Sequence, residues 1–127
     1  RVFYEDGMAR AGLQTGDPAV ADAVTLDRDH LKRMTFGDRS LERELLELFD
    51  RQSAMLMVRI RAGGDDAVAP LAHTLKGSAA GIGAVRVARA ADTAEHSPAA
   101  ECSQAVDRLA QAVAEARALI AELLRQA

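Results

Sequence analysis

The last quarter of the chain carries the feature that most constrains its fold, an apolar repeat that alternates steps of four and three residues. Seven small or aliphatic side chains follow this spacing: Cys102, Val106, Leu109, Val113, Ala116, Ile120 and Leu123. The repeat places every member on one side of an α-helix and is typical of helices that pack lengthwise against other helices. It therefore predicts a long final helix within a helical assembly.

The amino-acid composition favours the same class of fold. Of the 127 residues 49% are apolar, but only 3% are aromatic and none is tryptophan. A core built from Leu, Val, Ile, Met and Ala suits close helix packing better than a β-sandwich. The length suits one domain, and we find neither a strand pattern nor an internal repeat.

Two helices are expected in the first half of the chain. A short one over residues 26–36 ends at Gly37. Asp38, with Ser40 as its rival, is the N-cap of a long helix whose apolar positions continue to the glycine pair 63–64.

A third helix follows the glycine pair. Asp65 or Asp66 is its expected cap, and Pro70 fits only if it lies in the first turn. The helix is expected to stop near Gly81 or Gly83.

A fourth helix, rich in alanine, is expected over residues 84–96. Ser97 as N-cap and Pro98 at the first helical position then predict the start of the final helix. Together the segments predict an all-α fold, an antiparallel up-down four-helix bundle with a short additional N-terminal helix. We assign residues 25–127 to the bundle and residues 1–24 to an N-terminal arm whose order the sequence leaves open.

Charge and cysteine content restrict the partners. The 16 basic and 19 acidic side chains leave a net charge of -3. This charge does not favour binding to nucleic acid, and the sequence has no run of basic residues that would favour binding to a membrane surface. No apolar run approaches the roughly 20 residues that span a bilayer. A single cysteine, Cys102, excludes an intramolecular disulfide. We therefore expect a cytoplasmic protein, and we expect it to be a monomer.

His73 is the candidate functional residue of the third helix. At about 100° per residue, one side of this helix gathers an apolar face that must meet the core: Val68, Leu71, Leu75, Ala79 and Ile82. His73 lies on the opposite side, so its imidazole is expected to face solvent.

The neighbours of His73 on this outer side are unusual for a solvated helix. They are small or apolar, apart from one lysine: Ala69, Pro70, Lys76, Gly77 and Ala80. Gly77 costs about 1 kcal/mol of helix propensity relative to alanine. A backbone without a side chain here lets a partner approach the imidazole closely.

This pattern indicates phosphoryl chemistry. An exposed imidazole is largely neutral at pH 7 and can act as a nucleophile. Lys76, one turn further on, can offset charge on phosphoryl oxygens. No carboxylate cluster stands ready for the Mg²⁺ that phosphoryl transfer requires, so a partner must supply it. A zinc site from His73, His96 and Cys102 lacks any familiar ligand spacing.

Residues Ala72–Ala84, which read AHTLKGSAAGIGA, closely resemble the signature of histidine phosphotransfer (HPt) domains. The resemblance implies a four-helix bundle with His73 as phosphoacceptor and Lys76 and Gly77 as its helpers. Ser78 matches the motif serine, for which we expect local hydrogen bonding. One position departs from the pattern, since many members carry Asn where this chain has Gly81.

The resemblance also implies partners. A response-regulator receiver domain, a sensor histidine kinase or both would exchange phosphate with His73, with Mg²⁺ held by the receiver and no cofactor or metal in this chain. We expect docking at Ala69, Pro70, Ala80 and Gly81. No P-loop or kinase glycine motif is present, so ATP-dependent kinase activity is not expected.

Two alternatives remain open at this point. One is the phosphoacceptor input domain of a larger chemotaxis-type histidine kinase, which shares the motif. The other is a non-catalytic helical adaptor that dimerises through the apolar repeat of the final helix.

Overall fold

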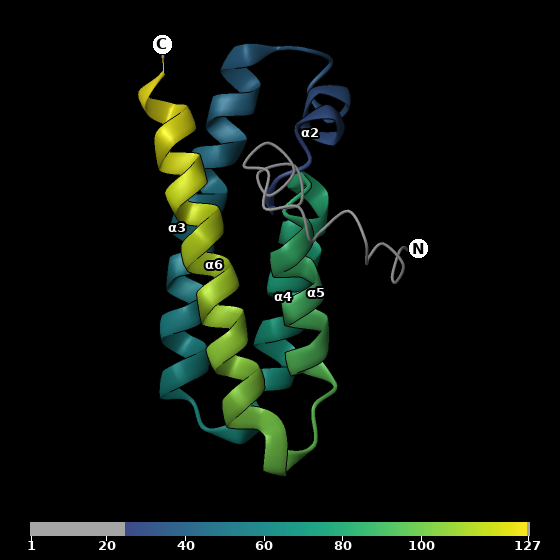
Figure 1. Ribbon diagram of the computed structural model, residues 1–127, viewed down its shortest axis with the longest axis vertical. Coiled ribbons are helices and arrows are strands. Elements are labelled where there is room, and N and C mark those ends of the chain that lie inside the picture. Colours follow the sequence, from purple (N-terminus) through teal and green to yellow (C-terminus); the bar gives the residue numbers. More distant parts are fainter. Residues whose placement is uncertain (1–24, 127) are drawn as a thin grey trace, which may run out of the picture.

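The structure, a computed structural model, describes residues 25–126; the predicted N-terminal arm lies outside them. Its elements in chain order are α2 (Arg28–Met34), α3 (Arg39–Ala62), α4 (Asp65–Ile82), α5 (Val85–Glu95), the 3₁₀ turn η2 (Ala99–Glu101) and α6 (Cys102–Arg125). Helices α3 to α6 run alternately down and up, and α2 lies beside the end of α4 (Figure 1). The predicted all-α bundle with one short additional helix is confirmed.

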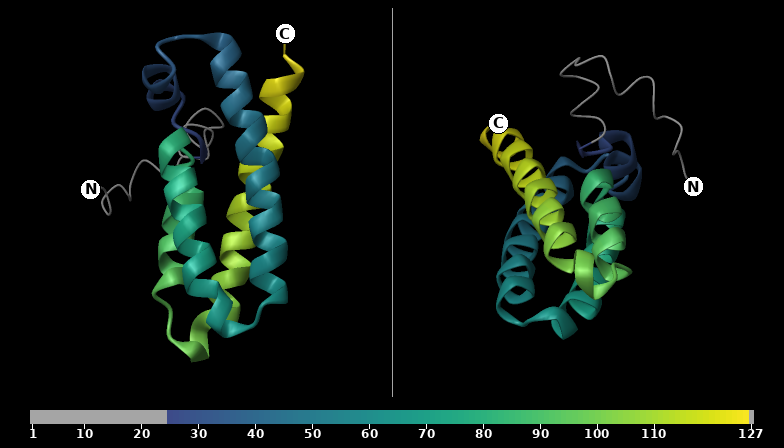
Figure 2. Two further views of the ribbon diagram at one scale, coloured as in Figure 1. Left: turned by 180° about the vertical axis from the view of Figure 1, so that it is seen from behind. Right: turned by 60° about the horizontal axis from the view of Figure 1, so that its bottom comes forward.

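Helices α3 to α6 form a closed ring of neighbours. Each packs against the next in the chain, and α6 returns to pack against α3 (Figure 2). Helices α3 and α6 have 24 residues each, about 36 Å of helix, whereas α5 has only 11. Because α4 and α5 are neighbours, their outer sides lie together along one edge of the bundle.

The apolar repeat of the final helix lies in the core, as predicted. Six of its seven members are buried, and Leu123 is half-buried near the chain end. Phe49 of α3 is the largest fully buried side chain among the described residues, in a core otherwise made of aliphatic groups and alanine. The repeat thus faces the protein's own helices.

Alanine supplies four of the eight buried residues of α4 and α5. Ala72, Ala79 and Ala91 are completely buried, and Ala94 is nearly so. Small side chains let two helices approach closely. Leu71, assigned to the core face, is half-buried and packs against the edge of the core, and Ala72 is also fully buried.

The start of α4 differs from prediction. Gly64 is its N-cap. Asp65 and Asp66 lie in the first turn, where their negative charges interact favourably with the positive end of the helix dipole, but neither side chain caps the helix. Pro70 lies inside the helix, beyond the first turn. Having no N–H, it leaves the Asp66 carbonyl without its intrahelical donor, a cost that packing of the buried side of α4 outweighs.

Helix α6 begins later than expected. Ser97 does not cap it, because the Ser97 hydroxyl donates to the Ala94 carbonyl at the end of α5 (3.0 Å). Pro98 stands before the turn η2, and α6 starts at Cys102. The predicted cap of α3 is confirmed, since the Leu41 N–H donates to the Asp38 carboxylate (3.1 Å).

Gly83 joins α2 to the end of α4. Its left-handed backbone (φ +84°) ends α4, and its carbonyl accepts a 2.7 Å hydrogen bond from the Asp27 N–H. A Cβ at this position would lie 2.7 Å from the Asp27 carbonyl oxygen, closer than packing allows. His30 adds a second link, its Nε2–H donating to the Gly81 carbonyl (3.1 Å).

We expect Gly83→Ala to lower the free energy of unfolding by at least about 2 kcal/mol, because the substitution adds a steric clash to the strain of positive φ. Gly37→Ala is the matched control. Gly37 also has positive φ (+75°), but a Cβ added there would meet nothing within 4 Å, so the loss should be about 1 kcal/mol. Urea unfolding measures both, and equal losses would contradict the role given to the contact with Asp27.

Candidate functional site

His73 lies in the middle of α4 on the outer side of the bundle. Its side chain is 67% exposed, in keeping with the orientation expected from the helix wheel. Ala72 and Leu75, close to it on either side in the sequence, are fully buried. They anchor this turn of α4 in the core, which fixes the position of the imidazole beside the neighbouring helix α5.

A carboxylate from α5 contacts the imidazole. The Nδ1 atom of His73 lies 2.9 Å from Oε2 of Glu95, the last residue of α5. The hydrogen bond from Lys76 lowers the pKa of Glu95, so this carboxyl group is ionised at neutral pH and can only accept. Nδ1 must therefore carry the proton, which leaves Nε2 of the neutral ring as the free lone pair.

Lys76 shares the same carboxylate. Its Nζ lies 2.8 Å from Oε1 of Glu95 and 3.1 Å from Oδ1 of Asp92. Hydrogen bonds to Glu95 and then to Asp92 raise the pKa of Lys76, so the ammonium is fully charged at neutral pH. The two oxygens of Glu95 thus connect the imidazole of His73 to the ammonium of Lys76.

The other residues of the predicted site lie around His73 on the surface. Ala69, Pro70, Gly77 and Ala80 are exposed. A Cβ built at Gly77 meets no atom within 4 Å, so packing within the described chain does not require glycine there.

Gly81 and Ser78 lie at the edges of this surface. Gly81 is half-buried, and its carbonyl is engaged by His30 of α2. Ser78 is half-buried as well, but its hydroxyl makes no hydrogen bond with any residue from 25 to 126, so the expected local hydrogen bonding is absent there.

Glu95 and Asp92 were missed by sequence reasoning. They follow His73 by 22 and 19 residues and reach it only because α5 folds back along α4. One signal was available: α5 ends in two acidic side chains and has no basic residue in its last turn. Acidic groups are unfavourable at the negative end of a helix dipole, so their presence there calls for a partner such as Lys76.

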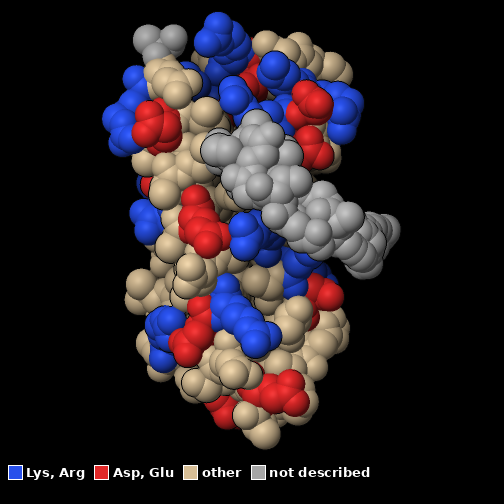
Figure 3. Space-filling model, viewed as in Figure 1, with Lys and Arg blue, Asp and Glu red and all other residues tan. Residues whose placement is uncertain are grey.

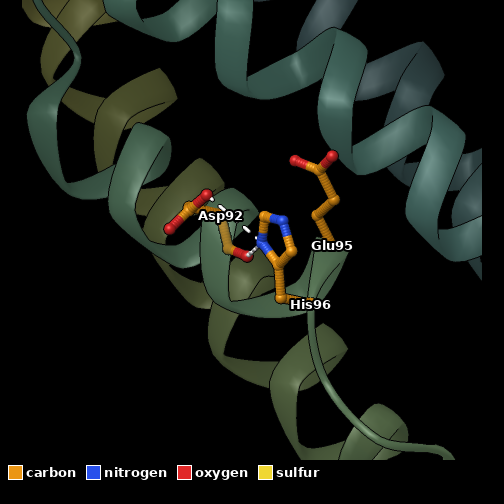
Figure 4. A group of neighbouring side chains, drawn as sticks. All are labelled: Asp92, Glu95 and His96. Carbon is orange, nitrogen blue, oxygen red and sulfur yellow. Dashed lines mark hydrogen bonds and ion pairs between the residues drawn. The ribbon is translucent and has the colours of Figure 1, made fainter.

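Asp92, Glu95 and His96 form a cluster at the end of α5 (Figure 4). One ligand atom from each lies within 4.8 Å of the others, which is within reach of a metal ion. The group is explained without one, since Lys76 holds both carboxylates and Nδ1 of His96 donates to the Asp92 carbonyl (2.9 Å). Cys102 is buried and does not join His73 and His96.

Charges of both signs are spread along the bundle. On the face drawn in Figure 3, Lys and Arg side chains lie among Asp and Glu side chains over much of the length, and the lowest part shows only acidic and uncharged residues. Within residues 25–126 no helix is both long enough and apolar enough to cross a bilayer.

Comparison with known families identifies the class of protein. The family model described as the Hpt domain matches residues 40–119, which cover α3 to α5 and most of α6. The chain therefore belongs to the Hpt domain family, whose members carry out histidine phosphotransfer in phosphorelays and interact with receiver domains and histidine kinases. Neither the curated proteins nor the solved structures yielded a significant match.

We expect the ring of His73 to populate the Nδ1–H tautomer at about pH 8, where an ordinary imidazole is neutral. Glu95→Gln removes the ionised acceptor, so the population should move toward the Nε2–H form. Ring ¹⁵N chemical shifts measure this balance. Glu101→Gln, which changes an exposed carboxyl at the end of the turn η2, is the control. An unchanged tautomer in Glu95→Gln would refute the orienting role of this carboxylate.

Proposed function

We propose that this chain is a phosphorelay intermediate that accepts a phosphoryl group on Nε2 of His73 from the aspartyl phosphate of a receiver domain and can return it. The observation that carries the proposal is the exposed imidazole whose Nδ1 is held by Glu95, so that the other nitrogen faces solvent with its lone pair free. The membership of the chain in the Hpt domain family gives this site its reaction class.

The transfer needs little from the chain beyond position and charge. Nε2 attacks phosphorus, the new N–P bond forms, and the bond to the aspartyl oxygen breaks to release the partner's carboxylate. The ring keeps its proton on Nδ1 and becomes positively charged. Glu95, ionised and 2.9 Å from Nδ1, stabilises that charge without taking the proton.

We assign to Lys76 the stabilisation of the negative charge on the phosphoryl oxygens. Its ammonium lies one helical turn from His73 and is held there by Glu95 and Asp92. Positive charge close to the transferred group stabilises the negative charge that its oxygens carry throughout the transfer. Since both carboxylates are engaged by Lys76, we assign no metal to this chain and leave the Mg²⁺ of the reaction to the receiver domain.

We assign the surface around His73 to docking of the receiver domain. Ala69, Pro70 and Ala80 present little bulk, and the space beside Gly77 is open. A partner's active site can therefore reach Nε2 without moving long side chains. Gly81 is placed at the margin of this surface, because its carbonyl is covered by His30.

The two alternatives differ in what supports them. The adaptor hypothesis used the apolar repeat of α6 for dimerisation, but that repeat is buried within the bundle and unavailable to a second chain. In the kinase-input hypothesis His73 accepts phosphate by the same chemistry as in the relay, but the donor is a kinase and not a receiver domain. We favour the relay, and we place it in the cytoplasm, as the cysteine content predicts. Comparing phosphorylated receivers with kinases as phosphate donors distinguishes the relay from the kinase-input domain.

We expect His73→Gln to keep the fold and to lose all phosphate acceptance, because His73 is the exposed imidazole that Glu95 orients. The assay incubates the chain with a phosphorylated receiver domain and measures acid-labile, base-stable label, while circular dichroism reports the fold. His30→Gln, which removes a histidine outside the site, should keep the label. Full acceptance by His73→Gln would show that a different residue carries the phosphate.

We expect Lys76→Ala to slow transfer by roughly tenfold, since an exposed ammonium is partly screened by solvent. Its melting temperature should stay close to that of the wild type. Lys32→Ala is the matched control, because Lys32 is an exposed lysine of α2. Single-turnover rates measure the effect, and equal rates for the two variants would exclude the proposed role of Lys76.

A further inference from the structure

Asp92 is a second carboxylate at the site, and the proposed transfer gives it no contact with the reacting imidazole. Of the two acidic groups, Glu95 lies closer to Lys76, with 2.8 Å between Oε1 and Nζ, and its side chain is only 18% exposed. Oδ1 of Asp92 lies 3.1 Å from the same ammonium, and its side chain is 57% exposed. Glu95 is sufficient to keep Lys76 beside His73, so the presence of Asp92 calls for another explanation.

Asp92 lies about one helical turn before Glu95 on the side of α5 that reaches Lys76 of α4. Its carboxylate also lies beside the ring of His96, whose Nδ1 is 3.4 Å from Oδ1 (Figure 4). His96 uses Nδ1 for a shorter bond to the backbone carbonyl of Asp92 (2.9 Å). Because an ordinary imidazole is neutral at about pH 8, Lys76 is the charged partner of the Asp92 carboxylate at that pH.

The ammonium of Lys76 is shared between two negative charges. Glu95 and Asp92 both pair with it, so the three groups together carry a net negative charge. Each carboxylate offsets part of the electric field of the ammonium. Lys76 therefore attracts a further anion less strongly than an ammonium paired with Glu95 alone.

This sharing affects the phosphoryl group, which carries close to two negative charges at neutral pH. Lys76 is the cation that we assign to its oxygens. An ammonium has three N–H donors, and Glu95 and Asp92 engage two of them. The phosphoryl oxygens must compete for the charge of Lys76 with Asp92, the more exposed of the two carboxylates. Asp92 therefore weakens the stabilisation of phosphorylated His73.

We propose that Asp92 is a positioning residue that acts through Lys76, withholding part of the charge of the ammonium so that phosphorylated His73 readily passes its phosphate to a receiver domain. The inference rests on the proposed function, because it concerns the same exchange. In one direction the bond from Nε2 to phosphorus forms while the aspartyl O–P bond breaks. The reverse direction restores both, and no other reactant is consumed. Asp92 moves this equilibrium toward the phosphorylated receiver.

The equilibrium of the exchange tests the proposal, with a receiver domain whose aspartyl phosphate outlasts the exchange. At about pH 8 and low salt, Asp92→Asn should raise the ratio of phosphorylated His73 to phosphorylated receiver about threefold to fivefold, the scale of one exposed ion pair. Asp107→Asn is the matched control, because Asp107 is an exposed aspartate that pairs with Arg61 across α3 and α6 (3.3 Å). It should leave the ratio unchanged, and circular dichroism should show an intact fold in both variants.

Three further measurements separate a role through Lys76 from a general effect of the substitution. In a Lys76→Ala background, Asp92→Asn should no longer raise the ratio, because the group through which Asp92 acts is gone. Asp92→Glu keeps the negative charge and should keep the wild-type ratio. Added salt screens exposed charges, so the difference between Asp92→Asn and the wild type should shrink as ionic strength rises.

The proposal is overturned if Asp92→Asn leaves the ratio unchanged or lowers it, since a lower ratio would mean that Asp92 helps Lys76 to hold the phosphate. It is also overturned if the effect of Asp92→Asn persists in full without Lys76. A wild type that takes no label from any phosphorylated receiver contradicts the proposed function, and this inference with it. The two failures are distinguishable, because the first is seen only in a chain whose wild type accepts phosphate.

Discussion

The close contact between α4 and α5 is the constraint on which the site depends. Half of the buried residues of the two helices are alanines, so the helices can approach each other closely. Only this closeness lets the carboxylate at the end of α5 reach the imidazole in the middle of α4. A larger side chain at Ala72 or Ala79 would force the helices apart and separate Glu95 from His73, although neither alanine touches the reacting atoms.

The contact between α4 and α5 also brings the charged groups of the site together, so that the ammonium of Lys76 pairs with the carboxylates of Asp92 and Glu95. Two carboxylates at the negative end of α5 are unfavourable there, and Lys76 of α4 offsets both. The same pairing keeps Glu95 ionised and therefore able to orient His73. Stability and chemistry are linked here: as pH falls through the lowered pKa of Glu95, the carboxylate protonates, and both its contribution to folding and its hold on the imidazole are lost.

The helices could be predicted well from the sequence because their apolar spacing and end signals are local. The repeat in α6 and the Asp38 cap of α3 illustrate this. Predictions failed where two local signals competed, as at Pro98, which suits a first helical position but stands before a 3₁₀ turn. Within the site, His73, Lys76 and Gly77 share one helix and could be found together. Glu95 could not, because its role depends on how far α5 folds back along its neighbour.

The separation of His73 and Glu95 along the chain has a kinetic consequence. Both lie in one helical hairpin joined by the short turn at Gly83, so closing the contact costs little chain entropy. The pairing of α3 with α6, by contrast, must bring together segments from opposite ends of the described chain. Contacts between residues near in sequence form fastest in small domains. The reactive imidazole and its acceptor are thus expected to meet early in folding, before α3 and α6 pair.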